Sequence, residues 1–285
     1  MFRYYDLHRR TRSDDITMLF PGWRGKDEVV LVLAPHDDDA VLGPGFAVAA
    51  AQEHGAAVHV LVFHDGSAGY ATDDERIGIV ELRREETLRA LARLDVPPRS
   101  IHRFELPDFT GPQFLGWRLP SGDLGVFGRL VPLARRIRAT RLLIANGYRE
   151  HIDHWGVHLA GLFFGPQAGD PVCGDWGAPC AIRSALVYSV WADFDPEDAL
   201  LNRRDEKLRA NRAVAAPPEV EQKIRAALAE WKSQAAIIDA VGQARDQRRL
   251  DDGHFLELYL ALQPRPRLEY GPYLELVSKI DGEPK

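Results

Sequence analysis

Apolar runs and helical patterns alternate over roughly the first two-thirds of the chain. Short apolar runs rich in β-branched residues predict strands, because strands buried on both faces read as nearly continuous apolar segments. These predicted strands are Glu28–Ala34, Ala57–Phe63, Ser100–Leu106, Arg141–Ala145 and Ala181–Val190. Helical periodicity fills the intervals at Val41–His54, Glu75–Leu94, Val126–Thr140 and Asp153–Phe164. The pattern predicts an α/β fold with a mostly parallel central sheet covered by helices.

The last third of the chain has a different character. It contains two helical stretches, Pro196–Ala213 and Pro218–Val241, followed by a mixed tail. No Gly/Ser tract, Pro-rich run or repeat separates it from the rest. We therefore expect one domain over residues 1–285. Residues from about 28 to 190 form its α/β core and carry the site, and residues from about 191 to 285 complete it with helices and a mixed tail.

Composition narrows the classes of partner and the compartment. The 285 residues are 45% hydrophobic and carry a net charge of −6, which argues against a nucleic-acid-binding surface. No apolar stretch approaches the ~20 residues needed to span a bilayer, and the first residues lack the pattern of a secretory signal. Two cysteines, Cys173 and Cys180, bracket a short loop and could pair in an oxidising compartment. The simpler expectation is a cytoplasmic protein, and the oligomeric state stays open, with a homo-oligomer possible.

Potential ligands and acid–base groups follow each of the first four predicted strands. Because the carboxyl ends of parallel strands meet at one edge of a sheet, where α/β proteins bind ligands, we expect these groups to converge. They are His36, Asp37, Asp38 and Asp39 after the first strand, His64 to Ser67 after the second, Asp108 after the third, and Asn146 to His154 after the fourth. Acidic residues after a strand are also common in turns and helix caps, so the first cluster alone leaves both interpretations open.

Two of the clusters together suggest a metal site. His36, Asp39 and His154 supply two imidazoles and one carboxylate, a set that matches catalytic zinc sites with an open position for water. The same set matches mononuclear Fe(II) sites, so the ligands do not decide the metal. A carboxylate next to the metal can take a proton from the bound water. His151 is then free to act as an acid or electrophile, and Asp153 can orient an imidazole.

Two motifs in these clusters resemble those of the LmbE-like or PIG-L de-N-acetylases, a family of zinc-dependent hydrolases. The family's His-Pro-Asp-Asp-Glu motif corresponds to residues 36–40, and its His-x-Asp-His motif to residues 151–154. Two departures occur in the first motif, because Asp37 replaces the proline and Ala40 replaces the glutamate. Weaker agreement, which extends the match to most of residues 28–235, involves Phe63 to Gly66, Arg83, Glu86, Ala90, Leu94, and Lys232 to Gln234.

The resemblance implies a Rossmann-like three-layer sandwich and an N-deacetylase that hydrolyses a linear amide bond. Zn²⁺, or Fe²⁺ or another divalent metal, is then held by His36, Asp39 and His154. Asp38 is the general base, and His151 stabilises the oxyanion and protonates the departing amine. The implied reaction removes an N-acyl group, commonly acetyl, from an amino sugar such as N-acetylglucosamine or from a glycoconjugate. Residues implied near the substrate or around the ligands are Asp37, Asp108 and Asp153.

Several alternatives remain open from the sequence. The substrate can instead be an acylated non-sugar natural product or a thiol conjugate. A haloacid-dehalogenase-like phosphatase would use Asp37 and Asp39, but it leaves the three histidines without a role. A metal-stabilised carbohydrate-binding protein without catalysis and an Fe(II) oxygenase also share parts of the pattern. Aromatic residues in the loops Phe109–Asp123 and Gly165–Pro179 either contact substrate or pack against the scaffold.

Overall fold

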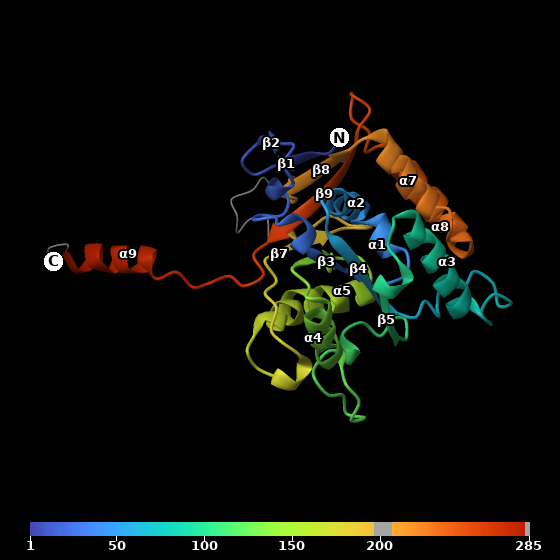
Figure 1. Ribbon diagram of the computed structural model, residues 1–285, viewed down its shortest axis with the longest axis horizontal. Coiled ribbons are helices and arrows are strands. Elements are labelled where there is room, and N and C mark those ends of the chain that lie inside the picture. Colours follow the sequence, from blue (N-terminus) through green and yellow to red (C-terminus); the bar gives the residue numbers. More distant parts are fainter. Residues whose placement is uncertain (197–206, 283–285) are drawn as a thin grey trace.

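A single mixed sheet organises the computed structural model, which describes residues 1–196 and 207–282 (Figure 1). Within these residues the sheet has nine strands in the order β2-β1-β8-β9-β7-β6-β3-β4-β5. The strands are β1 (Arg3–Asp6), β2 (Thr11–Ser13), β3 (Val29–Ala34), β4 (Ala57–His64), β5 (Ile101–Leu106), β6 (Arg141–Ala145), β7 (Ser184–Tyr188), β8 (Arg212–Ala216) and β9 (Phe255–Leu262).

The five strands predicted from the sequence form the parallel half of this sheet. β3 pairs in parallel with β4 and β6, β4 pairs with β5, and β6 pairs with β7. Beyond β7 the pairings with β9, β8, β1 and β2 are antiparallel. The α/β class is therefore confirmed, but the sheet is mixed rather than mostly parallel. The four antiparallel strands were not predicted.

Helices lie on both sides of the parallel strands. They are α1 (Asp39–Leu42), α2 (Gly45–Glu53), α3 (Ile79–Arg93), α4 (Val126–Ile137), α5 (Ile152–Leu159), α7 (Pro218–Leu228), α8 (Ala235–Asp246) and α9 (Gly271–Gly282). Figure 1 shows α4 and α5 on one side, and α1, α2, α3, α7 and α8 on the other. This arrangement leaves the carboxyl ends of the parallel strands available for a site. The last helix, α9, projects away from the body.

Three predicted helices differ from the observed ones. Val41–His54 is divided into α1 and α2 at Gly43, where a Cβ atom would lie 2.2 Å from the Tyr188 ring. Pro218–Val241 is divided into α7 and α8 by a turn that follows the buried Trp231. Most of Pro196–Ala213 falls outside the described residues, but its last two residues belong to β8 and the helix prediction is wrong there. Pairing with β1 and β9 outweighs the local helical preference.

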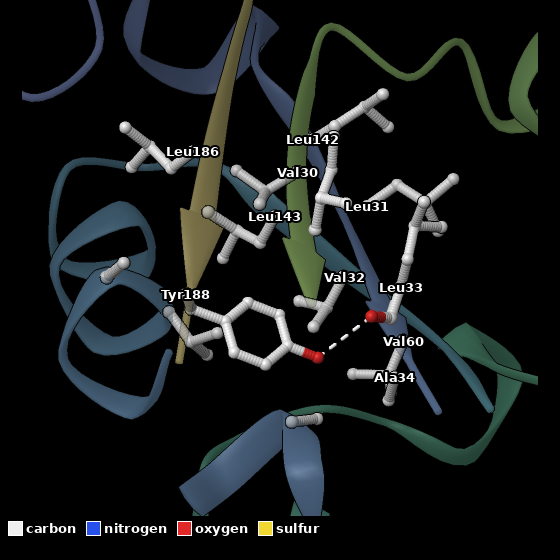
Figure 2. Packing of buried hydrophobic residues seen from close by; sticks show 14 of the residues in the cluster. Val30, Leu31, Val32, Leu33, Ala34, Val60, Leu142, Leu143, Leu186 and Tyr188 are labelled. Carbon is white, nitrogen blue, oxygen red and sulfur yellow. Dashed lines mark hydrogen bonds between the residues drawn. The ribbon is translucent and has the colours of Figure 1, made fainter. Parts of the chain in front are cut away.

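The centre of the core is β3, whose residues from Val30 to Ala34 are fully buried. Figure 2 shows the neighbouring strands packing around it, with the Tyr188 hydroxyl donating a hydrogen bond to the Leu33 carbonyl at 2.8 Å. The same Tyr188 ring lies against Gly43, as described above. One buried side chain therefore fixes both the end of β3 and the start of the helical segment after it. The segment between these two points contains His36 to Asp39.

Candidate metal centre

The turn after β3 presents two of the expected ligands. The backbone N–H of His36 donates to Oδ2 of Asp39 at 2.8 Å, which closes the turn and starts α1 at Asp39. On the other side of the site, His151 is the N-cap of α5, and its Nδ1 accepts from the backbone N–H of Asp153 at 3.2 Å. His154 then lies in the first turn of α5. Two helix starts at neighbouring strand ends thus bring the two sequence motifs together.

His36, Asp39 and His154 form a group whose donor atoms lie within 4.8 Å of one another. Oδ2 of Asp39 is 3.3 Å from Nδ1 of His36 and 3.2 Å from Nε2 of His154. Burial opposes charge on all three side chains, but their mutual contacts dominate. These contacts lower the pKa of Asp39 and, with help from neighbouring carboxylates, raise the pKa of His154 to about 9 and that of His36 to about 10. The donors favour a positive charge at this point, and a divalent cation can supply it in place of protons.

Glu150, which the sequence analysis did not single out, contacts the ring nitrogen of His154 that faces away from Asp39. Its Oε2 lies 2.6 Å from Nδ1 of His154, which leaves Nε2 directed at Asp39. Its Oε1 accepts from the Ser189 hydroxyl and from three successive backbone N–H groups, those of residues 190–192. Burial raises the pKa of Glu150, but the contact with His154 outweighs it and lowers the pKa overall. The i,i+4 spacing between Glu150 and His154 is the sequence signal that could have predicted this contact.

Asp153 is fully buried and lies among three imidazoles, one of which is His36 of the ligand group. Its carboxylate accepts from the backbone N–H groups of Phe109 and Gly111 at 2.8 and 2.7 Å. Its oxygens lie 3.2 Å from Nε2 of His36, 3.3 Å from Nε2 of His64 and 3.3 Å from Nδ1 of His151. Burial opposes the charge, but the contacts with His36 and His64 and the two backbone N–H groups lower the pKa of Asp153 to about 2. The carboxylate can therefore orient His36, while the backbone N–H of the same residue orients His151.

The sequence analysis included His64 only among the residues at the end of the second predicted strand. It is buried, with Nδ1 3.0 Å from the Pro35 carbonyl oxygen. With His36 and Asp153 it forms a second group of donor atoms within 4.8 Å. This second group shares His36 with the first, and its carboxylate is already bound by two backbone amides. The first group is therefore the better candidate for a metal.

Asp38 lies beside the ligand group and lines the same cavity. It is 7% exposed, and its Oδ1 is 3.6 Å from Nη2 of Arg83. Burial raises the pKa of Asp38, and the nearby Asp39 adds to this effect, while Arg83 opposes it. A carboxylate with raised basicity next to a metal position is suited to accept a proton.

Asp37 points to the arginines rather than to the imidazoles. It is fully buried, and Oδ1 accepts from the Thr87 hydroxyl at 2.7 Å and from Nη1 of Arg103 at 2.5 Å. Its Oδ2 lies 3.3 Å from Nε of Arg83. The third acid of the cluster thus holds Arg83 in place beside Asp38. The sequence could not assign this role because both arginines lie far along the chain.

A cavity of about 200 Å³ opens over these residues. Asp108 helps to shape it, because its carboxylate accepts from the backbone N–H groups of Gly66 and Ala68 at 3.0 and 2.9 Å. Phe109, 63% exposed, and Trp191, 54% exposed, provide aromatic surface at the cavity. The cavity is lined by His36, Asp38, Asp39, Ala68, Gly69, Arg83, Asp108, Phe109, His151, His154, Trp191, Gln234 and Ile237.

Of the aromatic residues in the two loops considered for substrate contact, some line the cavity and others pack against the scaffold. Phe109 lines the cavity and lies 4.4 Å from the His151 ring, centroid to centroid. Trp117 and Trp176 instead pack edge-to-face on each other with centroids 6.0 Å apart. Trp191 was missed although it directly follows the predicted strand Ala181–Val190, because only acid–base groups after the first four strands were considered.

The weaker family-like positions contact one another across the fold. Glu86 on α3 accepts from the backbone N–H of Ser233 at 3.0 Å and from its hydroxyl at 2.6 Å. The side-chain amide of Gln234 donates to the Gly69 carbonyl at 2.6 Å. These bonds join α3, the loop after β4 and the start of α8 at one side of the cavity.

Comparison with known proteins agrees with the motifs. Residues 31–163 match the family model "PIG-L: GlcNAc-PI de-N-acetylase", a segment that contains all of the expected ligands. This segment of the chain belongs to the PIG-L, or LmbE-like, family. No curated protein matches its sequence significantly.

Solved structures share the fold at low sequence identity. A 4-carboxy-2-hydroxymuconate hydratase from Pseudomonas putida KT2440 has 17% identity and a TM-score of 0.61, over 85% of this chain and 99% of that one. The N,N′-diacetylchitobiose deacetylase from Pyrococcus horikoshii has 14% identity and a TM-score of 0.56, over 83% and 84%. A zinc-inhibited form of teicoplanin deacetylase has 17% identity and a TM-score of 0.53, over 82% and 98%.

Proposed function

We propose that this protein is a metal-dependent N-deacetylase that removes an N-acyl group, with acetyl as the first candidate, from an amino sugar or glycoconjugate. The observation that carries the proposal is the convergence of a ligand group, a buried acid and an imidazole on one small cavity. Membership of the PIG-L family and the deacetylases among the proteins of similar fold support it.

The residues present fit a divalent metal, with zinc as the first candidate. Two imidazoles and one carboxylate are a common donor set for catalytic zinc, and Glu150 and Asp153 orient the imidazoles as outer carboxylates do in such sites. His36, Asp39 and His154 would hold the ion. When bound, it would supply Lewis acidity and lower the pKa of a coordinated water.

The chain's own residues divide the proton transfers between them. Asp38 accepts a proton from the attacking water while the oxygen of that water bonds to the acyl carbon. The C–N bond then breaks, and the leaving nitrogen takes up a proton, so the products are an amine and a carboxylate. His151 is suited to donate that proton because its Nδ1 accepts from the backbone N–H of Asp153, which leaves the Nε2–H group for the substrate.

The cavity limits the size of the reacting group. A volume of about 200 Å³ suits the acyl group and one ring, and Phe109 and Trp191 provide apolar faces on which a sugar ring can stack. The rest of a larger glycoconjugate would extend into solvent. Both cysteines are free, which fits the reducing cytoplasm that we propose as the compartment. In the described part of the chain, no helix is long and apolar enough to cross a membrane.

The experiment that tests the proposal is metal removal and reconstitution. The chelated protein is supplied with Zn²⁺, Fe²⁺, Co²⁺ or Mg²⁺ and assayed for acetate and free amine on a panel of N-acetylated amino sugars and acylated natural products. We expect hydrolysis that requires one metal ion per chain. Phosphatase activity that requires Mg²⁺, oxygen consumption with Fe²⁺, hydration of an unsaturated acid, or metal binding without any amide hydrolysis would each overturn the proposal.

A further inference from the structure

Helix α9 carries an exposed apolar face, which is interrupted only by Asp281 near its C-terminal end. At about 100° per residue, its five large apolar side chains fall within an arc of roughly 160°. They are Tyr273, Leu274, Leu276, Val277 and Ile280, and each is 52–63% exposed. Glu275, Ser278 and Lys279 lie on the opposite side of the helix. Figure 1 shows that the helix projects from the body, and none of its residues is buried.

A helix of this kind needs a surface to pack against. Isolated helices shorter than ~12–15 residues are marginal in water, and their stability in proteins comes from packing of the apolar face. α9 has 12 residues, and nothing in the described part of its own chain buries them.

The segment that leads to α9 is directed away from the body. Nε of Arg265 donates to the Pro166 carbonyl at 3.2 Å, and Nη2 pairs with Asp170 at 2.7 Å. Pro264 and Pro266 flank this anchor, and prolines favour an extended backbone at themselves and at the preceding residue. The anchor and the prolines disfavour a return of α9 onto the surface from which the segment departs.

That surface contains an apolar groove. Its volume is about 990 Å³, and its walls include Leu162 and Phe163 from the turn after α5 and Leu262 at the end of β9. Phe163 is 61% exposed. Arg265, Arg267 and Asp170 line the same groove and give it a net positive charge, whereas the acid Asp281 lies on the apolar side of α9. The helix and the groove are therefore complementary both in apolar character and in charge.

We propose that α9 of one copy packs its apolar face into this groove of a second copy, and that the exchange is reciprocal. Each copy holds both halves of the contact, so a two-fold arrangement satisfies both at once. Two such contacts would cover ten large apolar side chains and a matching area of groove, which is on the order of the ~1,200 Å² at which stable interfaces begin. A membrane surface is a poorer occupant, because helices that lie on membranes are rich in Lys and Arg on the polar face.

The exchange also bears on the site. The groove wall formed by Leu162 and Phe163 belongs to the turn Ala160–Phe164 that continues α5, the helix that carries His154. A partner helix packed there would brace the far end of that helix.

The test is the mass of the full chain in solution, by light scattering and sedimentation across a wide range of concentration. We expect a dimer. Leu274→Glu with Val277→Glu should halve the mass, and so should Phe163→Glu in the groove. The control is Ser278→Glu, which adds one negative charge, as Phe163→Glu does, but on the opposite face of α9, and it should leave the dimer intact. A monomeric wild type, or a dimer that survives both sets of variants, would overturn the proposal.

A disulfide check separates exchange between copies from folding back within one copy. In a Cys173→Ser background, the double variant Leu276→Cys and Phe163→Cys should form a covalent dimer on oxidation. A covalent monomer would show that α9 returns to its own groove. A monomer that sediments with vesicles of phosphatidylcholine and phosphatidylserine would instead identify a lipid surface as the occupant, and both results would contradict the proposal.

Discussion

Two carboxylates separated by one residue, Asp39 and Asp37, lie in opposite electrostatic surroundings. Asp39 meets the imidazoles of His36 and His154, which we call the imidazole side of the cluster. Asp37 meets the guanidinium groups of Arg83 and Arg103, which we call the arginine side. Arginines carry permanent charge and neutralise their carboxylate themselves. Imidazoles can be neutral, so the carboxylate on their side still requires a cation, and only that side is suited to a metal.

The largest expected effect is on metal binding at the imidazole side. Asp39→Asn removes the charge of a proposed ligand and should lower metal affinity by more than the 10–100-fold that is typical of changes to residues that support metal ligands. Asp37→Asn, on the arginine side, should leave the metal stoichiometry unchanged. Titration with a competing chelator measures both variants. Equal losses would remove the distinction between the two sides.

The free energy of unfolding should depend more on the arginine side than on the imidazole side. Asp37→Ala leaves Arg83 and Arg103 without their buried partner, and we expect a loss of about 3–5 kcal/mol in the free energy of unfolding. Glu105→Gln removes an exposed partner of Arg103 and should cost less than about 1 kcal/mol. Urea unfolding of the metal-free proteins compares them. A near-neutral Asp37→Ala would show that the arginine side is not a structural ion-pair cluster.

Loss of the Glu150 charge should lower metal affinity less than loss of a proposed ligand does. Glu150→Gln keeps the shape of the side chain but removes its charge, and should lower metal affinity or activity about 10–100-fold. The exposed Glu81→Gln on α3 is the control, with no expected change. If Glu150→Gln matches the control, the imidazole side does not depend on its outer carboxylate.

The smallest effect concerns pH and the opposite end of β3, where the pattern of the arginine side recurs. Glu28 is buried against Arg141 and Arg183, and although burial opposes it, these contacts lower the pKa of Glu28 to about 2. A lowered carboxyl pKa adds stability above the ordinary value near 4.5, and this stability is lost as pH falls from there towards 2. Glu28→Gln should flatten the stability profile in that window. An unchanged acid profile would contradict this assignment.

The parallel half of the fold was predictable because its strands are nearly continuous apolar runs. The antiparallel half was not, since β9 mixes buried and exposed positions and the start of β8 lies in a stretch whose local pattern favours a helix. Its strands depend on pairing partners that are distant in the sequence, and local pattern carries no record of such pairings.

The candidate site shows the same division. Two compact motifs predicted that His36, Asp39 and His154 would meet, and their donor atoms do lie within 4.8 Å. The partners of Asp37 could not be predicted, because Arg83 and Arg103 reach it from α3 and β5. Glu150 and His64 lay in segments already under consideration, but only their contacts reveal what they support.

The most direct test is Asp38→Asn, measured for turnover and metal content in the same preparation. Asp38 lies between the two sides and lines the cavity, and its loss as a general base should lower kcat by about 10²–10⁴-fold while one metal ion per chain is retained. A variant that hydrolyses its substrate at a near-normal rate with the metal bound would contradict the proposed chemistry.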